Sequence, residues 1–580
     1  MRPLVDAAGA ATPGGLKHRL VQLASTLKHH RTDWEDHYRD LAEFVLPRRG
    51  RFDNQSQSKR GQKINRKILN SRGTLALRTL QSGMQTGITS PARPWFRLVP
   101  EDHELQGHGP AKEYLNDVGR IMRQFFQSTG TYNALHTGYG DLGLYGTDAA
   151  ILEPHPRFRF LLHQLVPGEF WLGANDDNLI DTLYHEAWMT AEQIVGRFVY
   201  GGSRNAEPDW TRVTPQVKSL WDKGNRSEQV LVSRLIMPRY NRDPMRLTPD
   251  NKPFMSVWWE HGSSTDAVLR NSGYDRNPII ASRWFKTGNE VYGRSPGMDA
   301  LPDVKTLQTQ ERDKAEAVQR MNRPPMNAPT SLRNSPFSLL PGAVNFTDLD
   351  RGVVPAYQVD PPVNELRQDI RETEDRVDEA FYANLFLMMA RLDRRQITAR
   401  EVDERHEEKL IGLGPVLELQ HHEKLRPLIK GAFDILDAAG ELPEPPAELD
   451  GQELKIDYIS MLAQAQKAVA TGGVERLAGF IGNMAAVKPT VLDKFDEDVA
   501  VEEYADMLGT PARIVRDQDE VDAIRAERAE QEAQQQQLEA ATQVAPAAHE
   551  GAQAAKVLAD ASEPRGPSPR DVLNRIGLGR

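Results

Sequence analysis

The stretch SPGMDALPDVKTLQTQERDKAEAVQRMNRPP, residues 295–325, decides the architecture of this chain. Its apolar side chains recur at intervals that combine threes and fours, which is the spacing of one helix face. A helix of about 24 residues is roughly 36 Å long at 1.5 Å per residue. The pair Pro324 and Pro325 ends it, because proline cannot continue helical hydrogen bonding. The apolar positions are Met298, Leu301, Val304, Leu307, Ala315, Val318 and Met321.

The next segment, 326–362, is proline-rich, with turns and short β-like pieces that are too small to carry a core. A second helix is predicted from Asn364, with apolar positions at Leu366, Ile370, Val377, Phe381 and Leu385. Two helices joined by a coreless tip cannot bury their apolar faces alone. The pattern therefore indicates neighbouring copies of the chain arranged in a ring.

On the N-terminal side, residues 16–46 show one apolar helix face, and a second helical pattern covers roughly 70–86. Residues 110–146 also look helical. Short apolar runs alternate with turns over 148–188 and again over 230–286, which predicts antiparallel strands. The fold class is therefore α+β and helix-rich.

On the C-terminal side, a very long helix is predicted from about Thr398 to Ala439. Gly412, Gly414 and Pro415 lie inside it, so we expect a kink near 411–415. Shorter helical patterns follow over 458–510. From 513 on, a charged helix and then a disordered tail are expected from the Gln-, Ala- and Pro-rich composition.

Composition narrows the classes of function. The chain has 580 residues, a net charge of −10 and no cysteine, which excludes disulfides, thiolate zinc sites and cysteine catalysis. Its length predicts several lobes. No apolar run approaches eighteen residues and the first residues lack an apolar signal core, so we expect neither a membrane-spanning nor a conventionally secreted protein. An acidic chain is suited to tolerating DNA nearby rather than gripping its phosphates.

No motif in the chain supports catalysis or a cofactor. Gly138, Gly140 and Gly143 match a dinucleotide-binding fingerprint by letters only, because a helix precedes them and a strand follows, so a packing role is favoured. No phosphate-binding loop of an ATP-driven motor is present. The sequence HEAWM at His185 lacks the second histidine of a zinc-protease helix. The histidine pairs at 29–30 and 421–422 are interpreted as solvated helix faces. No metal and no cofactor are expected.

Two charged segments leave alternatives open. The second helix, 364–382, is mostly acidic, which is typical either of a solvated, salt-bridged face or of a surface that a polyanion slides past. The sequence ARLDRR places Arg391, Arg394 and Arg395 in a predicted loop between helices. Such a loop usually lies on the surface without a specific function. In a ring, however, its copies would form a circle of basic side chains that faces the phosphates of passing DNA.

The stretch SGMQTGITSPARPWFRL, residues 82–98, joins a small-residue helix to a strand. Gly83 and Gly87 allow a neighbouring element to approach closely. Two prolines stiffen the exit from the helix, and two aromatic residues anchor the following strand in the core. We therefore predict packing roles here for Pro91, Pro94, Trp95 and Phe96.

Two stretches carry a resemblance to a known family: LNSRGTLALRTLQSGMQTGITSPARPWFRL (69–98) and TAREVDERHEEKLIGLGPVLELQHHEKLRPLI (398–429). Both resemble the portal, or head-to-tail connecting, proteins of short-tailed, podovirus-type bacteriophages. The similarity, which includes the order of the predicted elements, spans roughly residues 16–510. The chain end beyond about 513 departs from those relatives that continue into a long helical barrel.

The resemblance implies a portal-type protomer assembled as a twelve-fold ring. Its parts would be an α/β wing (1–295), stem helices (296–322 and 363–384), a small α/β clip (323–362), a channel or tunnel loop (385–398), a kinked long helix returning to the wing (399–457), a helical crown (458–512) and a charged tail (513–580). Arg391, Arg394 and Arg395 would lie nearest DNA. The stem candidates for lining the channel are Lys305, Lys314, Glu372, Asp375 and Glu379.

The implied function is a non-enzymatic one in the virion. The ring would occupy one capsid vertex after assembly in the bacterial host cytoplasm, contact capsid and scaffolding protein through the wing, and pass double-stranded DNA during packaging and ejection. Its clip would dock the terminase large subunit and later the tail adaptor. The alternatives are a vertex scaffold or adaptor without a channel and, with less support, a DNA-processing packaging subunit.

Overall fold

The computed structural model describes residues 15–47, 49–52, 67–102, 109–201, 207–243, 245–323, 326–327, 330, 354–355, 363–392, 403–449, 454–460, 462, 477–485, 488, 490, 495–496, 498–501 and 521–535. The chain forms two compact units, one of Met1–Glu101 and Glu113–Gly509, the other of Asp102–Lys112 and Thr510–Arg580. All the sheets belong to the first unit.

Two antiparallel sheets organise this unit, as the alternating runs predicted. A five-stranded sheet has the order β4-β5-β6-β7-β8, and a three-stranded sheet has the order β3-β2-β9. Their strands are β2 (Thr147–His155), β3 (Arg159–Gln164), β4 (Phe170–Ala174), β5 (Ile180–Thr190), β6 (Gln229–Pro238), β7 (Phe254–Glu260), β8 (Arg270–Tyr274) and β9 (Ile279–Arg283).

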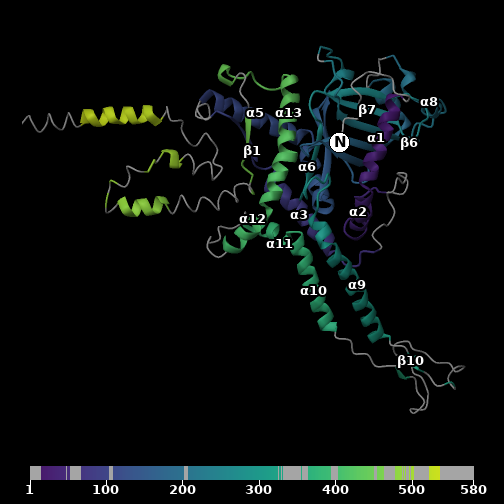
Figure 1. Ribbon diagram of the computed structural model, residues 1–580. Helices are drawn as coiled ribbons and strands as arrows, with labels where there is room; N and C mark the ends of the chain where they lie inside the picture. Colours follow the sequence, from purple (N-terminus) through teal and green to yellow (C-terminus); the bar gives the residue numbers. More distant parts are fainter. Residues whose placement is uncertain are drawn as a thin grey trace, which may run out of the picture. The chain divides into compact units, whose positions relative to one another are not determined.

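Each face of the five-stranded sheet is covered by a different element. On one face, α1 (Leu16–His30) lies across the strands and packs Leu20 and Leu27 against Trp171 and Tyr184 (Figure 1). On the other face, side chains of the three-stranded sheet complete a core that includes Ile151. We call the two sheets with α1 and α2 (Thr32–Phe44) the sheet body.

The predicted single helix over 16–46 is wrong, because Arg31 separates α1 from α2. Its side chain is 1% exposed and donates to the carbonyl of Phe170. The guanidinium lies 4.6 Å from the Trp171 ring centre and 2.9 Å from the Glu35 carboxylate. The break in the helix thus coincides with a buried cation whose charge is met by a carbonyl and a carboxylate.

The segment 82–98 runs from a helix into a strand, as its residue types predicted. Helix α3 (Arg72–Ile88) leads to β1 (Phe96–Pro100), which pairs antiparallel with β12 (Leu454–Tyr458). Trp95 and Phe96 are 1% and 0% exposed, and Trp95 stacks on Phe126. Pro91 and Pro94 are exposed, and the packing and stiffening roles expected for the four residues stay predictions.

Gly138, Gly140 and Gly143, which match the dinucleotide-binding motif by letters, lie in α6 (Thr131–Tyr145), and α6 follows α5 (Gly109–Ser128). Added Cβ atoms would lie 2.5 Å from Asp148 at Gly138, 2.9 Å from Gln81 at Gly140 and 2.6 Å from Leu80 at Gly143. Because each glycine admits a close neighbour, the packing interpretation is confirmed. His185 lies in strand β5 rather than in a helix, which removes the context of a zinc-protease motif.

Between β5 and β6 lie α7 (Ala191–Ile194), the π-turn η2 (Val195–Val199), η3 (Trp210–Arg212) and α8 (Pro215–Asp222). A short turn, η4 (Pro249–Asn251), precedes β7. After β9 come α9 (Pro296–Asn322), β10 (Met326–Asn327), β11 (Val354–Pro355), α10 (Val363–Ala380) and α11 (Ala383–Leu392). The predicted long helix is α12 (Asp403–Gln420), the π-turn η7 (His421–Leu425) and α13 (Arg426–Ala438), followed by η8 (Ala447–Leu449).

The long helix is irregular at a place the sequence did not predict. Pro415 lies inside α12, but the hydrogen-bonding pattern widens to a π-turn only at His421–Leu425. The expected kink at 411–415 stays a prediction. Residues 477–485, 498–501 and 521–535 are helical, in line with the short helical patterns and the charged helix, while the predicted tail beyond 535 lies outside the described residues.

Candidate functional site: the helix pair and its anchors

Helices α9 and α10 run side by side and lead to the short β10–β11 pairing (Figure 1). We call α9 and α10 the helix pair. Their contact is apolar near the sheet body, where Val304, Leu307, Ile370 and Val377 are at most 5% exposed. These residues were predicted from the helical spacing, because side chains separated by three or four positions meet on one face. Most of 323–362, the predicted clip, lies outside the described residues.

The far half of α9 has an uncovered apolar face. Its predicted apolar positions Val318 and Met321 are 38% and 46% exposed, and Ala315 is exposed as well. Met298 and Leu301, by contrast, are buried at the other end of the helix. The same periodic pattern is therefore covered in one half of the helix and open to solvent in the other.

A polar clamp from the start of α3 fixes the base of the helix pair. Gln308 of α9 is 3% exposed and its amide oxygen accepts from the backbone N–H of Asn70 at 2.8 Å. The Asn70 side chain donates to Glu374 of α10 at 2.8 Å. Arg72 donates to Asp378 at 2.8 Å, and this bond raises the pKa of the arginine. One segment thus ties both helices to the remainder of the unit.

The two predicted channel-lining lysines make ion pairs within the chain. Lys305 lies 2.7 Å from Asp40 of α2 and 5.2 Å from the ring centre of Phe44. Lys314 lies 2.5 Å from Glu311, one helical turn away. Both lysine side chains are partly exposed. The Lys305 contact therefore ties α9 to α2, the Lys314 contact stays within α9, and whether the two lysines face a channel stays a prediction.

The three predicted acidic lining residues share one face of α10. Glu372, Asp375 and Glu379 are exposed and separated by three and four residues, so they form one stripe. Glu372 accepts from Gln368 at 3.1 Å. On the adjoining surface, Arg376 pairs with Asp303 of α9 at 3.1 Å. Helix α10 thus carries both an ion pair and exposed acidic side chains, and the surface that a polyanion slides past stays a prediction.

The predicted loop over 385–398 is wrong for 385–392, because these residues belong to helix α11. Leu385 and Phe386 are 2% and 3% exposed. A Cβ at Gly83 of α3 would overlap the Phe386 ring, so the small-residue surface of α3 receives α11. This packing extends the helix into the predicted loop and confirms the close approach expected at Gly83. Arg391 is in the last turn of α11, and Arg394 and Arg395 lie outside the described residues.

The sequence missed a charged anchor on the π-turn η7. Lys424 is 2.5 Å from Asp148, and both side chains are nearly completely buried. Glu423 accepts from the Arg283 guanidinium at 3.1 Å. The available signal was the pair Glu423 and Lys424 within an otherwise amphipathic helix, where only the preceding histidine pair was interpreted, as a solvated face. In the structure, Lys424 and Glu423 make ion pairs with side chains of β2 and β9.

His421 also departs from the solvated interpretation. Its ring stacks on Tyr458 with a centroid distance of 3.9 Å and an interplanar angle of 3°. Burial lowers the pKa of His421 to about 4. The neutral ring is therefore the stable form at neutral pH. His422, the other member of the pair, is exposed as predicted.

The described residues contain no group of three or more histidine or carboxylate side chains placed to hold a metal ion. In the same part of the chain, no helix has the length and apolar character needed to cross a membrane. The sheet body carries a helix pair that is clamped at its base and exposes apolar side chains at its far end.

Comparison with known proteins gives the family. The bacteriophage head-to-tail connecting proteins match residues 17–515, and the chain belongs to this family. It is 40% identical over 514 residues to a probable portal protein of Bordetella phage BPP-1, which covers 88% of this chain and 91% of the relative. It is 39% identical over 548 residues to a portal protein of Salmonella phage epsilon15, with coverage of 94% and 95%.

The resemblance inferred from the sequence is thereby confirmed. Membership gives the chain a structural connecting role, not an enzymatic one, in a multimeric connector that joins capsid and tail. It also places the chain in the virion, at the junction of head and tail.

Proposed function

We propose that twelve copies of this chain form the portal ring at one capsid vertex, through which double-stranded DNA enters during packaging and leaves during ejection. The observation that supports this most is the uncovered half of α9, with Val318 and Met321 at 38% and 46% exposure on a helix clamped at its base. A ring provides neighbours for such a face on every subunit, because its contacts are heterologous and closed.

Within this proposal, residues 1–295 form the wing, α9 and α10 the stem, 323–362 the clip and 458–512 the crown. The clip docks the terminase large subunit during packaging and the tail adaptor afterwards, and the wing contacts capsid and scaffolding protein. The acidic stripe at Glu372, Asp375 and Glu379 faces the DNA path with Lys305 and Lys314. A surface of mixed but mainly negative charge lets a polyanion pass without strong binding. Assembly takes place in the host cytoplasm.

Electron microscopy and light scattering of the purified chain test the ring. The expected result is a closed ring of twelve subunits with a central hole. A stable monomer under assembly conditions would overturn the proposal. A closed assembly without a hole would favour the vertex scaffold or adaptor instead.

Replacing Arg391, Arg394 and Arg395 together by alanine tests the DNA path. Rings should form as in the parent chain, while the amount of DNA packaged or retained changes. The matched control replaces three exposed arginines that lie outside helices and strands, Arg157, Arg226 and Arg242, and changes the net charge equally. The same packaging change in both variants would show a general charge effect, and loss of rings in the first variant alone would make the segment structural.

A further inference from the structure

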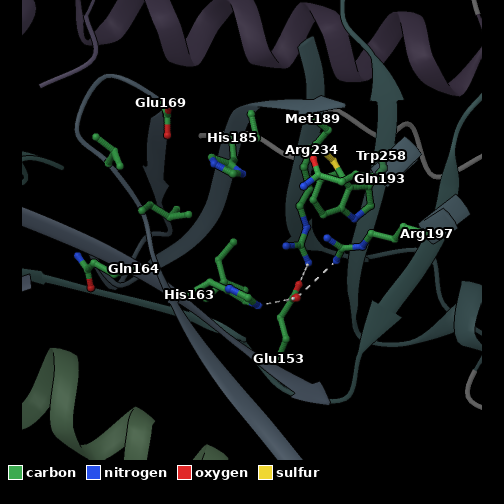
Figure 2. A pocket seen from close by; sticks show the side chains of 14 residues that line it. Glu153, His163, Gln164, Glu169, His185, Met189, Gln193, Arg197, Arg234 and Trp258 are labelled. Atoms are coloured by element: carbon green, nitrogen blue, oxygen red, sulfur yellow. Dashed lines mark ion pairs between the residues drawn. The ribbon is translucent and has the colours of Figure 1, made fainter. Parts of the chain in front are cut away.

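A pocket of about 350 Å³ lies between the two sheets of the sheet body, and no part of the proposed conduit function uses it (Figure 2). Strand register builds its floor. His185 of β5 pairs with Arg234 of β6, which pairs with Trp258 of β7, and Arg270 of β8 continues the row. Directly opposed residues point to the same face of a sheet. Four side chains far apart in the sequence therefore form one line, and the first three of them line the pocket.

The deepest charge in the pocket is already neutralised. The Arg234 guanidinium is 4% exposed and lies 2.6 Å from the carboxylate of Glu153, which comes from β2 in the opposite sheet. Tyr274 also donates to Glu153, at 2.8 Å. Together with Arg197 and His163, these groups lower the pKa of Glu153 to about 2 despite its burial. Glu153 and Arg234 are therefore an ionised internal pair that needs no ligand.

Arg197 is the less tightly held cation, because it shares Glu153 with Arg234. It lies on the π-turn η2, an irregularity that often marks functional positions. The turn follows a capping box between Thr190 and Gln193, which fixes the start of α7. The guanidinium is 4.7 Å from the Trp258 ring centre, and its contact with Glu153 is long, at 3.6 Å. Figure 2 shows Arg197, Arg234 and His163 converging on this one carboxylate.

The local charge is therefore positive within a chain of net charge −10. Two carboxylates line the pocket, Glu153 and Glu169, and Glu169 is paired with Arg51. Arg51, Arg234 and Arg197 therefore stand against two carboxylates, and His163 is held neutral at neutral pH because burial lowers its pKa. A partly enclosed excess cation beside an aromatic face is a site for an anion, since hydrogen bonds between two charged groups are the strong ones.

We propose that this pocket binds a carboxylate that carries an apolar group, with Arg197 as its charge partner. The wall supplied by Leu165, Val166, Ala187 and Met189 is apolar, which suits the body of the ligand. One available guanidinium matches a single negative charge better than a phosphate dianion. A volume near 350 Å³ accommodates a small organic acid or one acidic side chain with an apolar neighbour.

Calorimetric titration of the assembled protein with phenylacetate tests the site, with phenylacetamide as the neutral analogue. Saturable binding of phenylacetate is expected, and the amide should bind about 10-fold or more weakly, in keeping with a charge-assisted hydrogen bond. Arg197→Gln should weaken phenylacetate to a similar degree. The matched control is Arg226→Gln, because Arg226 also stacks on a tryptophan, Trp221 at 4.2 Å, but lies outside the pocket.

Two further titrations separate the sources of the carboxylate. A blocked Leu-Glu-Phe tripeptide that displaces phenylacetate with higher affinity identifies a protein segment as the ligand, and failure to displace it identifies a free organic acid. Both outcomes support the site. Absence of saturable phenylacetate and peptide binding, equal binding to the Arg197→Gln variant, or stronger binding of inorganic phosphate than of phenylacetate would overturn the proposal.

Discussion

The sheet body buries a pair of charged side chains, whereas the helix pair exposes acidic side chains to solvent. In the sheet body, Asp148 and the Lys424 of η7 form an ion pair at 2.5 Å with both side chains almost excluded from solvent. In the helix pair, the acidic side chains of Glu372, Asp375 and Glu379 are exposed. Within the helix pair, apolar side chains also divide along α9, where Val304 is 1% exposed and Val318 38%. The charged pair of the body is thus enclosed by one chain, whereas the far half of the helix pair leaves acidic and apolar side chains exposed.

The largest expected effect comes from breaking the buried pair. Lys424→Met leaves the Asp148 carboxylate in the core without its cation, and an uncompensated buried charge costs about 3–5 kcal/mol of unfolding free energy. Ser282 and its neighbours can satisfy only part of the hydrogen bonding of this carboxylate. Denaturant unfolding of the protomer, followed by tryptophan fluorescence, measures the loss.

The double variant Asp148→Asn with Lys424→Met is the control. Because it removes both charges, most of the lost stability should return, since breaking a buried pair is worse than replacing it. If the double variant is as unstable as the single one, the pair contributes through shape and not through charge.

Acid should destabilise the sheet body through His421. Its pKa is about 4 in the folded chain, below the usual 6.5, so the unfolded chain takes up a proton first. The stabilisation from the neutral ring is complete above pH 6.5 and is lost as the pH falls toward 4. Lowering the pH from 6.5 to 4.5 should cost about 2 kcal/mol from this residue alone.

The variant His421→Phe keeps the stack on Tyr458 and removes the proton site. Its stability should therefore fall less over this pH interval, measured as the difference between unfolding free energies at the two pH values. His422→Phe, at the exposed neighbouring position, should leave the pH dependence of the parent chain unchanged. Equal slopes for all three chains would contradict the assignment to His421.

The contact between α3 and α11 gives a smaller effect. Gly83→Ala places a methyl group against the Phe386 ring, and overpacking of this kind costs about 1–3 kcal/mol. Gly412→Ala is the matched control, because that helical glycine has open space around it and alanine favours the helix by up to about 1 kcal/mol. Thermal unfolding of the two variants should shift in opposite directions, and a common direction would contradict the close approach.

These regions also differ in how far the sequence predicts them. Helix α9 and the antiparallel strands follow from local periodicity, which the chain keeps when it folds. The burial of Arg31, Lys424 and Glu423 was not predicted. A charged residue in a helical pattern is usually solvated, and its burial depends on a partner more than a hundred residues away.

The pocket illustrates the same limit of local patterns. His185, Arg234 and Trp258 share a row only because the registers of three strands align them, and no single strand shows it. The available signal was Arg234 itself, a charged residue in the middle of the apolar run VLVSRLIM. A cation at such a position predicts a buried partner, but Glu153 could be identified only from the packing of the two sheets.

The sharpest comparison uses one residue type at two positions of α9. Val304→Asn should lower the unfolding free energy of the protomer by about 2–4 kcal/mol, because it introduces a polar amide into a fully buried site. Val318→Asn should change it by less than about 0.5 kcal/mol, since the side chain is 38% exposed in the single chain.

In a ring, however, Val318→Asn would place an amide in the apolar contact between neighbouring subunits. Protomer stability and the fraction of protein in rings must therefore be measured on the same samples. A stable Val318→Asn protomer that no longer assembles would locate the missing cover of α9 on the adjacent subunit, whereas normal assembly would mean that this face is open to solvent in the connector as well.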